Sequence, residues 1–253
     1  MSKHESQLLH TVDMRGMVTV IELSRILGVT DQTIRRISRP LVERGELRKV
    51  HGALVSNRKT SDPPFLARMN LNREAKVAIA HEIASIVQDG DSIAIDTGST
   101  SAFAAQALRT RQQLTVVTNS AFVASTLSMI PGNNVSMAGT QLRDHDGAAF
   151  DRSAFEVIER MQVDYVLLSA SMVESQNGFL VHEQCEVDIA TAMMENADYT
   201  IMAVDHSKFT PQKRKPALRQ PQLKNGSYLV TDGAPPPAFD DLLEGLKIRI
   251  ANT

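Results

Sequence analysis

The chain is poor in cysteine and in aromatic residues. Cys185 is its only cysteine, tryptophan is absent, and tyrosine occurs three times in 253 residues. A single cysteine excludes an intramolecular disulfide and a multi-cysteine metal site. The shortage of aromatic rings argues against an RNA-binding regulator, because single-stranded bases are usually stacked on aromatic side chains.

Long apolar runs are also missing. The sequence has no span of about 18 apolar residues, and its first residues include charged side chains instead of a continuous apolar run. We therefore expect no membrane-spanning segment, no secretory signal and no membrane partner, which predicts a cytoplasmic protein. A Walker motif and the G-x-G-x-x-G dinucleotide fingerprint are absent too, so we expect no cofactor.

Charge is distributed unevenly along the chain. The formal net charge is −2, but residues 1–58 carry ten Lys or Arg against six Asp or Glu, a balance of +4 that leaves −6 for the remainder. Because contacts with phosphates dominate the affinity of proteins for nucleic acids, the N-terminal part is the one expected to meet a polyanion.

Two short helices are predicted on either side of Gly28. Thr19 and Glu22 have the spacing of a capping box, which would satisfy backbone donors at the start of the first helix. Gly28 suits a left-handed turn after that helix, and Thr30 is a plausible N-cap for the second one. Two helices joined by such a tight turn are typical of a helix-turn-helix.

The second of these helices has an apolar and a cationic stripe. Ile34, Ile37 and Leu41 recur at i, i+3 and i+7, which leaves most polar and basic side chains off that face. We interpret it as the recognition helix that enters DNA, and the alternative is an ordinary solvated helix. Pro40 predicts that the helix stops or kinks near Arg39.

A small basic hairpin is predicted after this helix. Residues 46–50 and 53–55 are separated by His51 and Gly52, as expected for a wing that flanks the DNA groove. The alternative is an exposed basic hairpin without a ligand. The candidate DNA contacts of helix and wing are Thr30, Gln32, Thr33, Arg35, Arg36, Arg39, Arg48, Lys49 and His51.

The remainder of the chain alternates between apolar strands and helices after a polar stretch that ends in Pro63 and Pro64, which we interpret as a linker. Near-continuous apolar strands that alternate with helices predict a parallel sheet covered on both faces. Pro235–Pro237 is expected to begin a tail. The predicted strands are 92–96, 114–117, 135–138, 165–168, 200–204 and 228–230, and the predicted helices are 72–87, 100–108, 121–129, 152–161 and 186–196.

Hydroxyl, amide and charged side chains follow most of these strands. The carboxyl ends of parallel strands meet at one edge, where α/β proteins bind ligands. Gly98–Thr100 at a helix start would present N–H groups and hydroxyls to an anion such as the phosphate of a sugar. The alternative is that these are ordinary turn and cap residues. The candidate effector contacts are Asp96, Thr97, Gly98, Ser99, Thr100, Thr118, Asn119, Ser120, Gly139, Ser169, Glu186 and Lys208.

His182 and Glu186 raise the question of a metal site. On a helix they would share a face at i, i+4, but a second histidine at a suitable spacing is missing. We therefore favour an acidic cluster at a helix start and expect no metal.

Residues of the N-terminal segment match a family pattern. The pattern is V-S-x-x-T-I-R-R-D-L, followed by a glycine and by a basic hairpin that ends in H-G-G. The matching residues are Val29, Thr33, Ile34, Arg35, Arg36, Gly45, His51 and Gly52. The segment thus resembles the winged helix-turn-helix of the DeoR family of bacterial transcriptional repressors, and it departs from the pattern at Thr30, Ile37, Ser38 and Ala53.

The resemblance extends over nearly the whole chain. Asp96–Thr100, Thr118–Ser120 and Asp205–Phe209 are similar to the family motifs D-x-G-T-T, T-N-S and D-x-S-K-F. The likeness implies a ribose-phosphate-isomerase-like domain that binds an effector. The contacts that it implies first are Ser99, Thr100, Asn119 and Lys208.

Several glycines of the family pattern are replaced in this chain. Thr140 stands in place of the second glycine of a G-G motif, and Asp151 stands where a glycine usually precedes the next helix. Ser169 and Met172 occupy two further such places. Asp151 would repel a phosphate if it pointed inward, so the ligand would then differ from the usual sugar phosphates.

These features predict a small winged helix-turn-helix DNA-binding domain at 1–57, a linker at 58–71 and a Rossmann-like α/β effector-sensing domain at 72–253. The resemblance implies a transcriptional regulator, a repressor of a carbohydrate catabolic operon. It would bind double-stranded operator DNA as a homodimer or homotetramer, under the control of a phosphorylated sugar or related metabolite. The alternative is a phosphosugar isomerase-like enzyme with an appended DNA-binding module, in which Glu183, Glu186 or Asp205 would act as base. Because no two carboxylates clearly flank one loop, we expect no enzyme.

Overall fold

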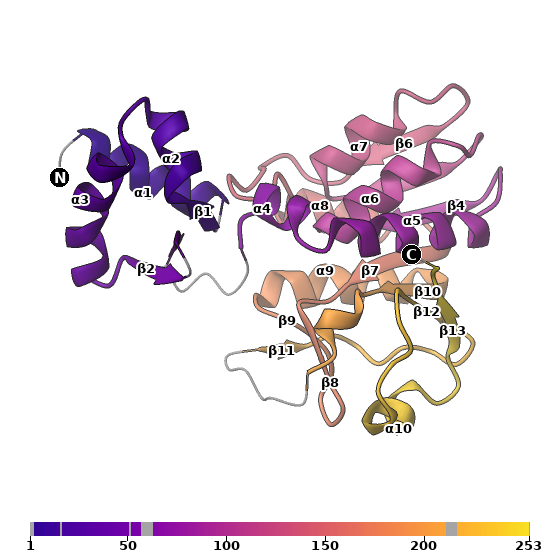
Figure 1. Ribbon diagram of the computed structural model, residues 1–253. Helices are drawn as coiled ribbons and strands as arrows, with labels where there is room; N and C mark the ends of the chain where they lie inside the picture. The colour runs from indigo at the N-terminus through magenta and orange to yellow at the C-terminus, as the bar shows by residue number, and fades with distance from the viewer. Residues whose placement is uncertain (1–2, 16, 51, 57–62, 211–216, 253) are drawn as a thin grey trace. The chain divides into compact units, whose positions relative to one another are not determined.

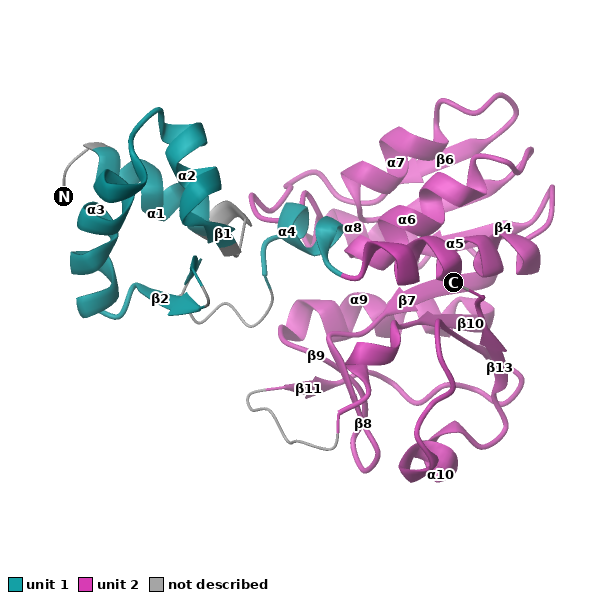
Figure 2. Cartoon of the chain, in the orientation of Figure 1, with its two compact units in different colours: residues 1–71 teal, residues 72–253 magenta. Residues whose placement is uncertain are grey.

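The computed structural model describes residues 3–15, 17–50, 52–56, 63–210 and 217–252. The chain divides into two compact units, residues 1–71 and residues 72–253, called here the first and the second unit (Figure 2). Across the described ranges, no helix is long and apolar enough to cross a membrane. The first unit has one hydrophobic core, and the second unit has two.

The first unit combines three helices with a small antiparallel sheet of strand order β1-β3-β2 (Figure 1). A fourth, short helix lies within the range expected to be a linker. The elements are α1 (Lys3–Arg15), β1 (Met17–Thr19), α2 (Val20–Leu27), α3 (Asp31–Glu43), β2 (Leu47–Val50), β3 (Ala53–Ser56) and α4 (Phe65–Asn70).

The predicted capping box and glycine turn are confirmed. The Thr19 hydroxyl accepts the Glu22 N–H at 3.2 Å, and the Glu22 carboxylate accepts the Thr19 N–H at 3.0 Å. Gly28 has a φ of 65° and ends α2, after which Thr30 caps α3. The apolar face of α3 packs into the core of this unit through Ile34, Ile37 and Leu41.

The recognition helix was expected to stop or kink near Arg39. It does not stop there, because α3 continues through Pro40 to Glu43, and the kink stays a prediction. Proline removes its own N–H donor and its ring crowds the carbonyl four residues earlier, but the turn that follows is held by the Arg44 N–H, which donates to Pro40 O at 3.0 Å. Leu41 is fully buried, and its carbonyl accepts the Glu46 N–H at 2.9 Å.

The second unit contains a seven-stranded sheet in which every neighbouring pair of strands is parallel, which confirms the predicted parallel α/β fold. Its order is β13-β12-β10-β7-β4-β5-β6. The strands are β4 (Ser92–Ile95), β5 (Thr115–Thr118), β6 (Asn134–Met137), β7 (Val163–Ser169), β10 (Ala197–Ala203), β12 (Tyr228–Thr231) and β13 (Lys247–Ile250).

Helices cover both faces of this sheet (Figure 1). Alternate residues of one strand enter two different cores: Ile93 and Ile95 pack with α5, α6 and α7, and Ala94 packs in the core of α8, α9 and α10. This explains the near-continuous apolar strands, because both faces are buried. The helices are α5 (Arg73–Ile86), α6 (Ser99–Leu108), α7 (Ala121–Leu127), α8 (Arg152–Ile158), α9 (Gln184–Glu195) and α10 (Asp240–Leu243).

The expected tail after Pro235–Pro237 is wrong, since the chain there forms a 3-10 turn η2 (Pro237–Phe239), α10 and the edge strand β13. A second sheet was also not predicted. Its three strands are antiparallel in the order β11-β9-β8 and have only two to four residues each. They are β8 (Met172–Glu174), β9 (Gly178–Val181) and β11 (Leu218–Arg219).

Candidate functional site

The outer face of α3 is cationic. Arg35, Arg36 and Arg39 are exposed, and so are Arg48 and Lys49 on β2. Among the described residues, no carboxylate forms an ion pair with the three arginines of α3. Such free guanidinium groups on a helix can hydrogen-bond to base edges or to phosphates. The sixth basic candidate, His51, lies outside the described residues.

The polar candidates at the start of α3 differ in whether their side chains are available to a ligand. Thr30 Oγ1 accepts the Thr33 N–H at 3.2 Å and lies 3.0 Å from Thr33 Oγ1, so both hydroxyls serve the helix cap. Gln32 is exposed, in the first turn of the same helix. The structure thus places Gln32 and the arginines where a ligand could reach them, and uses the threonines to fix the helix start.

A second candidate site lies where the order of the parallel strands reverses. The chain runs outward from β4 to β5 and β6, and then returns to β7 on the other side of β4. Such a switch point is where open α/β sheets bind ligands, outside the carboxyl ends of the strands. Asp96 follows β4 there, and its N–H donates to Leu167 O in β7 at 3.1 Å.

The loop after β4 approaches the end of β7 very closely. Gly98 has a φ of 135°, and a Cβ added to it would lie 2.8 Å from Ser169 Oγ. Only glycine fits this position without a shift of its neighbour. The structure therefore brings Gly98 and Ser169 together, and their roles as effector contacts stay predictions.

Buried polar atoms without partners are gathered in this region. Within the described part of the chain, Thr97 Oγ1, Ser101 Oγ and Asn119 Oδ1 have no hydrogen-bond partner although each side chain is at least nine-tenths buried. Leaving a buried polar atom unsatisfied costs about 1–3 kcal/mol. A ligand that supplied hydrogen bonds would remove this cost.

The neighbours of Asn119 are engaged in the fold. Thr118 Oγ1 donates to Ile95 O at 2.5 Å, which ties β5 to β4. Ser120 is the N-cap of α7. Among these three candidates, Asn119 is the one whose side chain is available to a ligand.

Four charged or polar groups meet around Asp96. Burial raises the pKa of the Asp96 carboxyl to about 7, and the negative charge of Glu186 raises it further. The Thr97 N–H, the Asn119 amide and Arg143 act in the opposite direction. Asp96 is thus a proton-binding group near neutral pH, within the electrostatic reach of Glu186 and Arg143.

Glu186 also has a structural role. Its Oε2 accepts the N–H groups of His182 at 3.2 Å and of Glu183 at 3.1 Å, which completes a capping box at the start of α9. The favoured interpretation of an acidic cluster at a helix start is confirmed. Among the described residues, no group of three or more potential ligands could hold a metal ion.

Arg143 is a functional candidate that was not predicted. It ion-pairs with Asp146, with Glu183 at 3.0 Å and with Glu186 at 3.7 Å, and its guanidinium lies 4.0 Å from the centre of the Phe150 ring. The sequence signal for Arg143 is weak: it is a basic residue in a loop at the carboxyl edge of the sheet.

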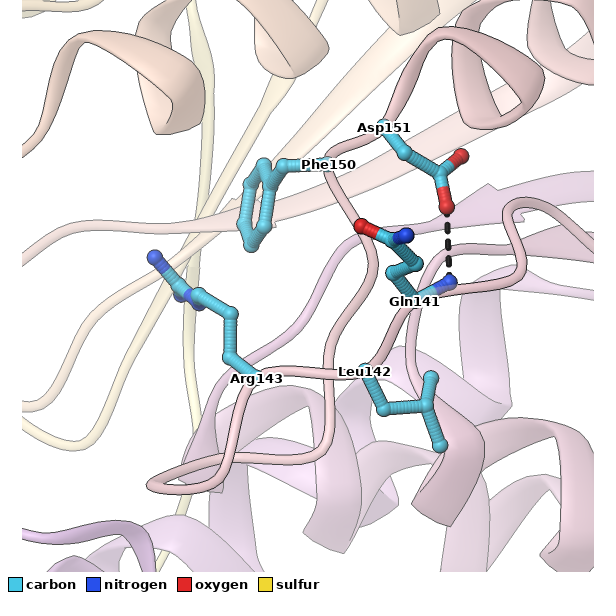
Figure 3. A pocket seen from close by; sticks show the side chains of 5 residues that line it. All are labelled: Gln141, Leu142, Arg143, Phe150 and Asp151. Atoms are coloured by element: carbon cyan, nitrogen blue, oxygen red, sulfur yellow. Dashed lines mark hydrogen bonds between the residues drawn. The ribbon is translucent and has the colours of Figure 1, made fainter.

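Arg143 also lines a cavity of about 320 Å³ (Figure 3). Phe150 lies beside Arg143, and on the other side the carboxylate of Asp151 accepts the N–H of Gln141. Gly139 lies against this wall, since a Cβ on it would be 2.4 Å from the Cβ of Ala149 and 3.3 Å from Asp151 Oδ1.

Lys208 lies in the 3-10 turn η1 (His206–Lys208), which follows β10 and begins at Asp205. Its side chain is half-buried. Within the described residues, no hydrogen bond or ion pair joins Lys208 to Asp96–Thr100 or to Asn119. The role of Lys208 as an effector contact therefore stays a prediction, as do those of Ser99 and Thr100, which are buried at the start of α6.

Comparison with protein families covers both units. A model described as the DeoR C terminal sensor domain matches residues 71–233. A second model, described as a DeoR-like helix-turn-helix domain, matches residues 5–60.

Individual relatives match over most of their length. The HTH-type transcriptional repressor CsqR of Escherichia coli (strain K12) is 30% identical over 96% of this chain and 92% of that protein. The glycerol-3-phosphate regulon repressor of the same organism is 29% identical over 98% of both chains. Among solved structures, ribose 5-phosphate isomerase A from Methanocaldococcus jannaschii matches 55% of this chain and 56% of its own with 20% identity and a TM-score of 0.40. A likeness of that size carries no argument about activity.

Proposed function

The chain belongs to the DeoR family, and on that premise we propose that it is a transcriptional repressor that binds operator DNA and responds to a phosphorylated sugar or related metabolite. Two relatives that match it over more than nine-tenths of its length are repressors by name. We assign DNA binding to residues 1–57, a linker to residues 58–71 and effector sensing to residues 72–253.

One observation carries the DNA-binding assignment. Arg35, Arg36 and Arg39 project from α3 without a carboxylate partner among the described residues, while the opposite face of the helix is anchored in the core of the first unit. A good bidentate contact between such a side chain and a base contributes about 1–3 kcal/mol of discrimination. One short helix reads few base pairs, so the operator-bound form is a homodimer or homotetramer.

The effector assignment is supported by the buried polar atoms at the switch point. In this proposal the phosphate lies at Gly98–Thr100, and the sugar hydroxyls meet Asp96, Asn119 and Glu186. Thr97 Oγ1 and Asn119 Oδ1 are buried there without partners among the described residues. Lys208 supplies a positive charge to the phosphate in this arrangement.

A thermal-shift screen tests the proposed effector class. The full-length chain is heated with glycerol 3-phosphate, pentose phosphates and hexose phosphates, and a specific ligand raises the melting temperature by mass action. Each hit is then added to a gel shift with the DNA upstream of the chain's own gene. Absence of a shifted band with any upstream fragment would contradict the repressor proposal.

We do not propose an isomerase. The Glu186 carboxylate, which is the best-placed candidate for a base beside Asp96, is engaged by two backbone N–H groups and by Arg143. A base must be free to take a proton from its substrate. Turnover of pentose or hexose phosphates by the purified chain would reverse this choice.

A further inference from the structure

In the segment between β6 and α8, the carboxylate of Asp151 occupies an anion site formed by the protein itself. Asp151 Oδ2 accepts the N–H groups of Thr140 at 2.8 Å and of Gln141 at 2.7 Å, together with the Thr140 hydroxyl at 3.0 Å. Asp151 Oδ1 accepts the Ala154 N–H at 3.0 Å and the Ser153 hydroxyl at 2.5 Å. Both carboxylate oxygens are therefore satisfied by the protein itself.

Successive backbone N–H groups that converge on one point form a common anion site in proteins. Here that point is taken by the side chain of Asp151. The hydrogen bond from Ser153 and those from the Thr140 and Gln141 N–H groups hold the pKa of Asp151 well below its usual range, so the group is ionised. Any second anion at this place would meet a fixed negative charge.

The Arg143 side of the cavity does not compensate the negative charge of Asp151. The Arg143 guanidinium, whose side chain is 17% exposed, is already shared by Asp146, Glu183 and Glu186. Three carboxylates around one guanidinium leave an excess of negative charge. A ligand group that enters the cavity is consequently favoured if it is a hydroxyl and disfavoured if it is an anion.

Arg143 links the cavity that it lines to the surroundings of Asp96. Arg143 lies 3.7 Å from Glu186, and both act on the pKa of Asp96. The segment that carries Asp151 is tied to the second strand end as well, because the Ala149 N–H donates to Asn119 O at 2.8 Å. A ligand whose phosphate lies at Gly98–Thr100 would therefore extend its other end toward Asp151.

We propose that Asp151 is a selectivity residue, which restricts the effector to phosphate monoesters whose remaining polar groups are hydroxyls and excludes ligands with a second anionic group. This inference rests on the proposed effector site. Like charges a few ångströms apart near a protein surface repel by more than the thermal energy, enough for a tenfold or larger difference in affinity.

Isothermal titration of the full-length chain tests the inference with two pairs of probes. Fructose 6-phosphate is compared with fructose 1,6-bisphosphate, and glucose 6-phosphate with 6-phosphogluconate, because each pair differs by one anionic group. We expect the wild-type chain to bind at least one monoester about tenfold or more tightly than its doubly anionic partner. Asp151→Asn, which keeps an acceptor for the cap, should narrow this ratio to about threefold or less.

Two further variants make the result interpretable. Asp144→Asn removes a fully exposed carboxylate from the same segment and should leave the ratio unchanged. Asp151→Ser retains an N-cap oxygen and replaces Asp151→Asn if the latter does not fold. Equal affinities of the wild-type chain for both members of the pairs, or a ratio that neither Asp151 variant changes, would overturn the inference and leave the effector site intact. If the wild-type chain binds none of the four probes at millimolar concentration, the hit of the thermal-shift screen is compared with its doubly phosphorylated counterpart in the same way. Absence of any hit in that screen overturns both the proposed effector class and the inference.

Discussion

Asn72 Nδ2 donates hydrogen bonds to Asp205 Oδ1 at 3.0 Å and to Ser207 Oγ at 2.9 Å. Asn72 is the residue at which the second unit begins, and Asp205 starts the turn that carries Lys208. These bonds join the entrance of the chain into the second unit to one of the proposed effector loops. Asn72 also has a φ of 50°, in the left-handed region that few residues other than glycine and asparagine adopt.

Two substitutions of Asn72 distinguish the contribution of its side-chain hydrogen bonds to stability from that of its left-handed backbone conformation. Asn72→Gly removes the two bonds but accepts the positive φ, and should lower the free energy of unfolding by about 1–2 kcal/mol. Asn72→Ala adds the strain of a left-handed alanine and should cost about 1 kcal/mol more than Asn72→Gly. Urea titrations followed by circular dichroism measure both.

The matched control for Asn72 is Gln113, the other non-glycine residue with a positive φ among those described. Gln113→Gly leaves the turn of Lys208 untouched and should not change effector affinity, whereas Asn72→Gly should weaken it. Equal effector affinities of the two variants would show that Asn72 does not position the Lys208 turn.

Replacement of Arg35 and Arg36 by Ala should abolish operator binding and leave effector binding intact. Both guanidinium groups are exposed on α3, so their loss removes contacts with DNA without creating a cavity in the core. A gel shift measures operator affinity, and titration with the effector measures the second site. If one arginine is replaced and contacts a phosphate, the slope of affinity against salt falls by about one.

Arg152→Ala provides the control for this double variant. Arg152 is an exposed arginine of the second unit, and within the described ranges its one ion pair is with Glu156 in the same helix. It should retain full operator affinity. Unchanged operator binding by the Arg35 and Arg36 variant would remove α3 from the DNA interface.

Features set by neighbouring residues could be predicted from the sequence. The capping box of Thr19 and Glu22 and the left-handed turn at Gly28 depend on side chains and backbone within four positions of one another. The buried strands could also be predicted from the sequence, because both of their faces are apolar. The end of α3 could not be predicted from neighbouring residues alone, since the helix continues past Pro40 and buries Leu41 in the core of the first unit.

Contacts between distant segments could not be predicted from one sequence. Arg143 meets Glu183 across 40 positions, and Asn72 meets Asp205 across 133. The edge strand β13 also escaped prediction, because its four residues are all exposed and the alternation of Lys247 and Arg249 with Ile248 and Ile250 is too short to stand out in the sequence. The sequence could name candidates such as Asp96 and Asn119, but only the strand order shows which loops adjoin.

Lys208→Ala should weaken effector binding and remove the response of the repressor to the effector. The ammonium group is the one positive charge in the proposed contact set for the phosphate, and loss of a charged hydrogen bond costs about 1.5–3 kcal/mol, or about tenfold to a hundredfold in affinity. Isothermal titration calorimetry with the ligand found in the thermal-shift screen measures the affinity of the variant. Lys247→Ala on the edge strand, where the ammonium lies over Tyr199 and Tyr228, is the control and should bind normally. Wild-type affinity in the Lys208 variant would show that Lys208 is not a contact.

Asp96 should make the second unit less stable as the pH rises toward neutrality. Burial raises its pKa from 3.8 to about 7 in the folded chain, so between these values the folded state holds a proton that the unfolded state has released. The contribution of Asp96 to the free energy of unfolding is therefore largest below about pH 4. It declines as the pH rises to about 7 and then levels off, with a total change of up to about 4 kcal/mol. Asp96→Asn cannot ionise and should lose this decline while keeping an acceptor for the Thr97 N–H. Urea titrations at pH 5, 6, 7 and 8 compare the two chains, and parallel pH profiles would show that Asp96 does not hold its proton in the folded state.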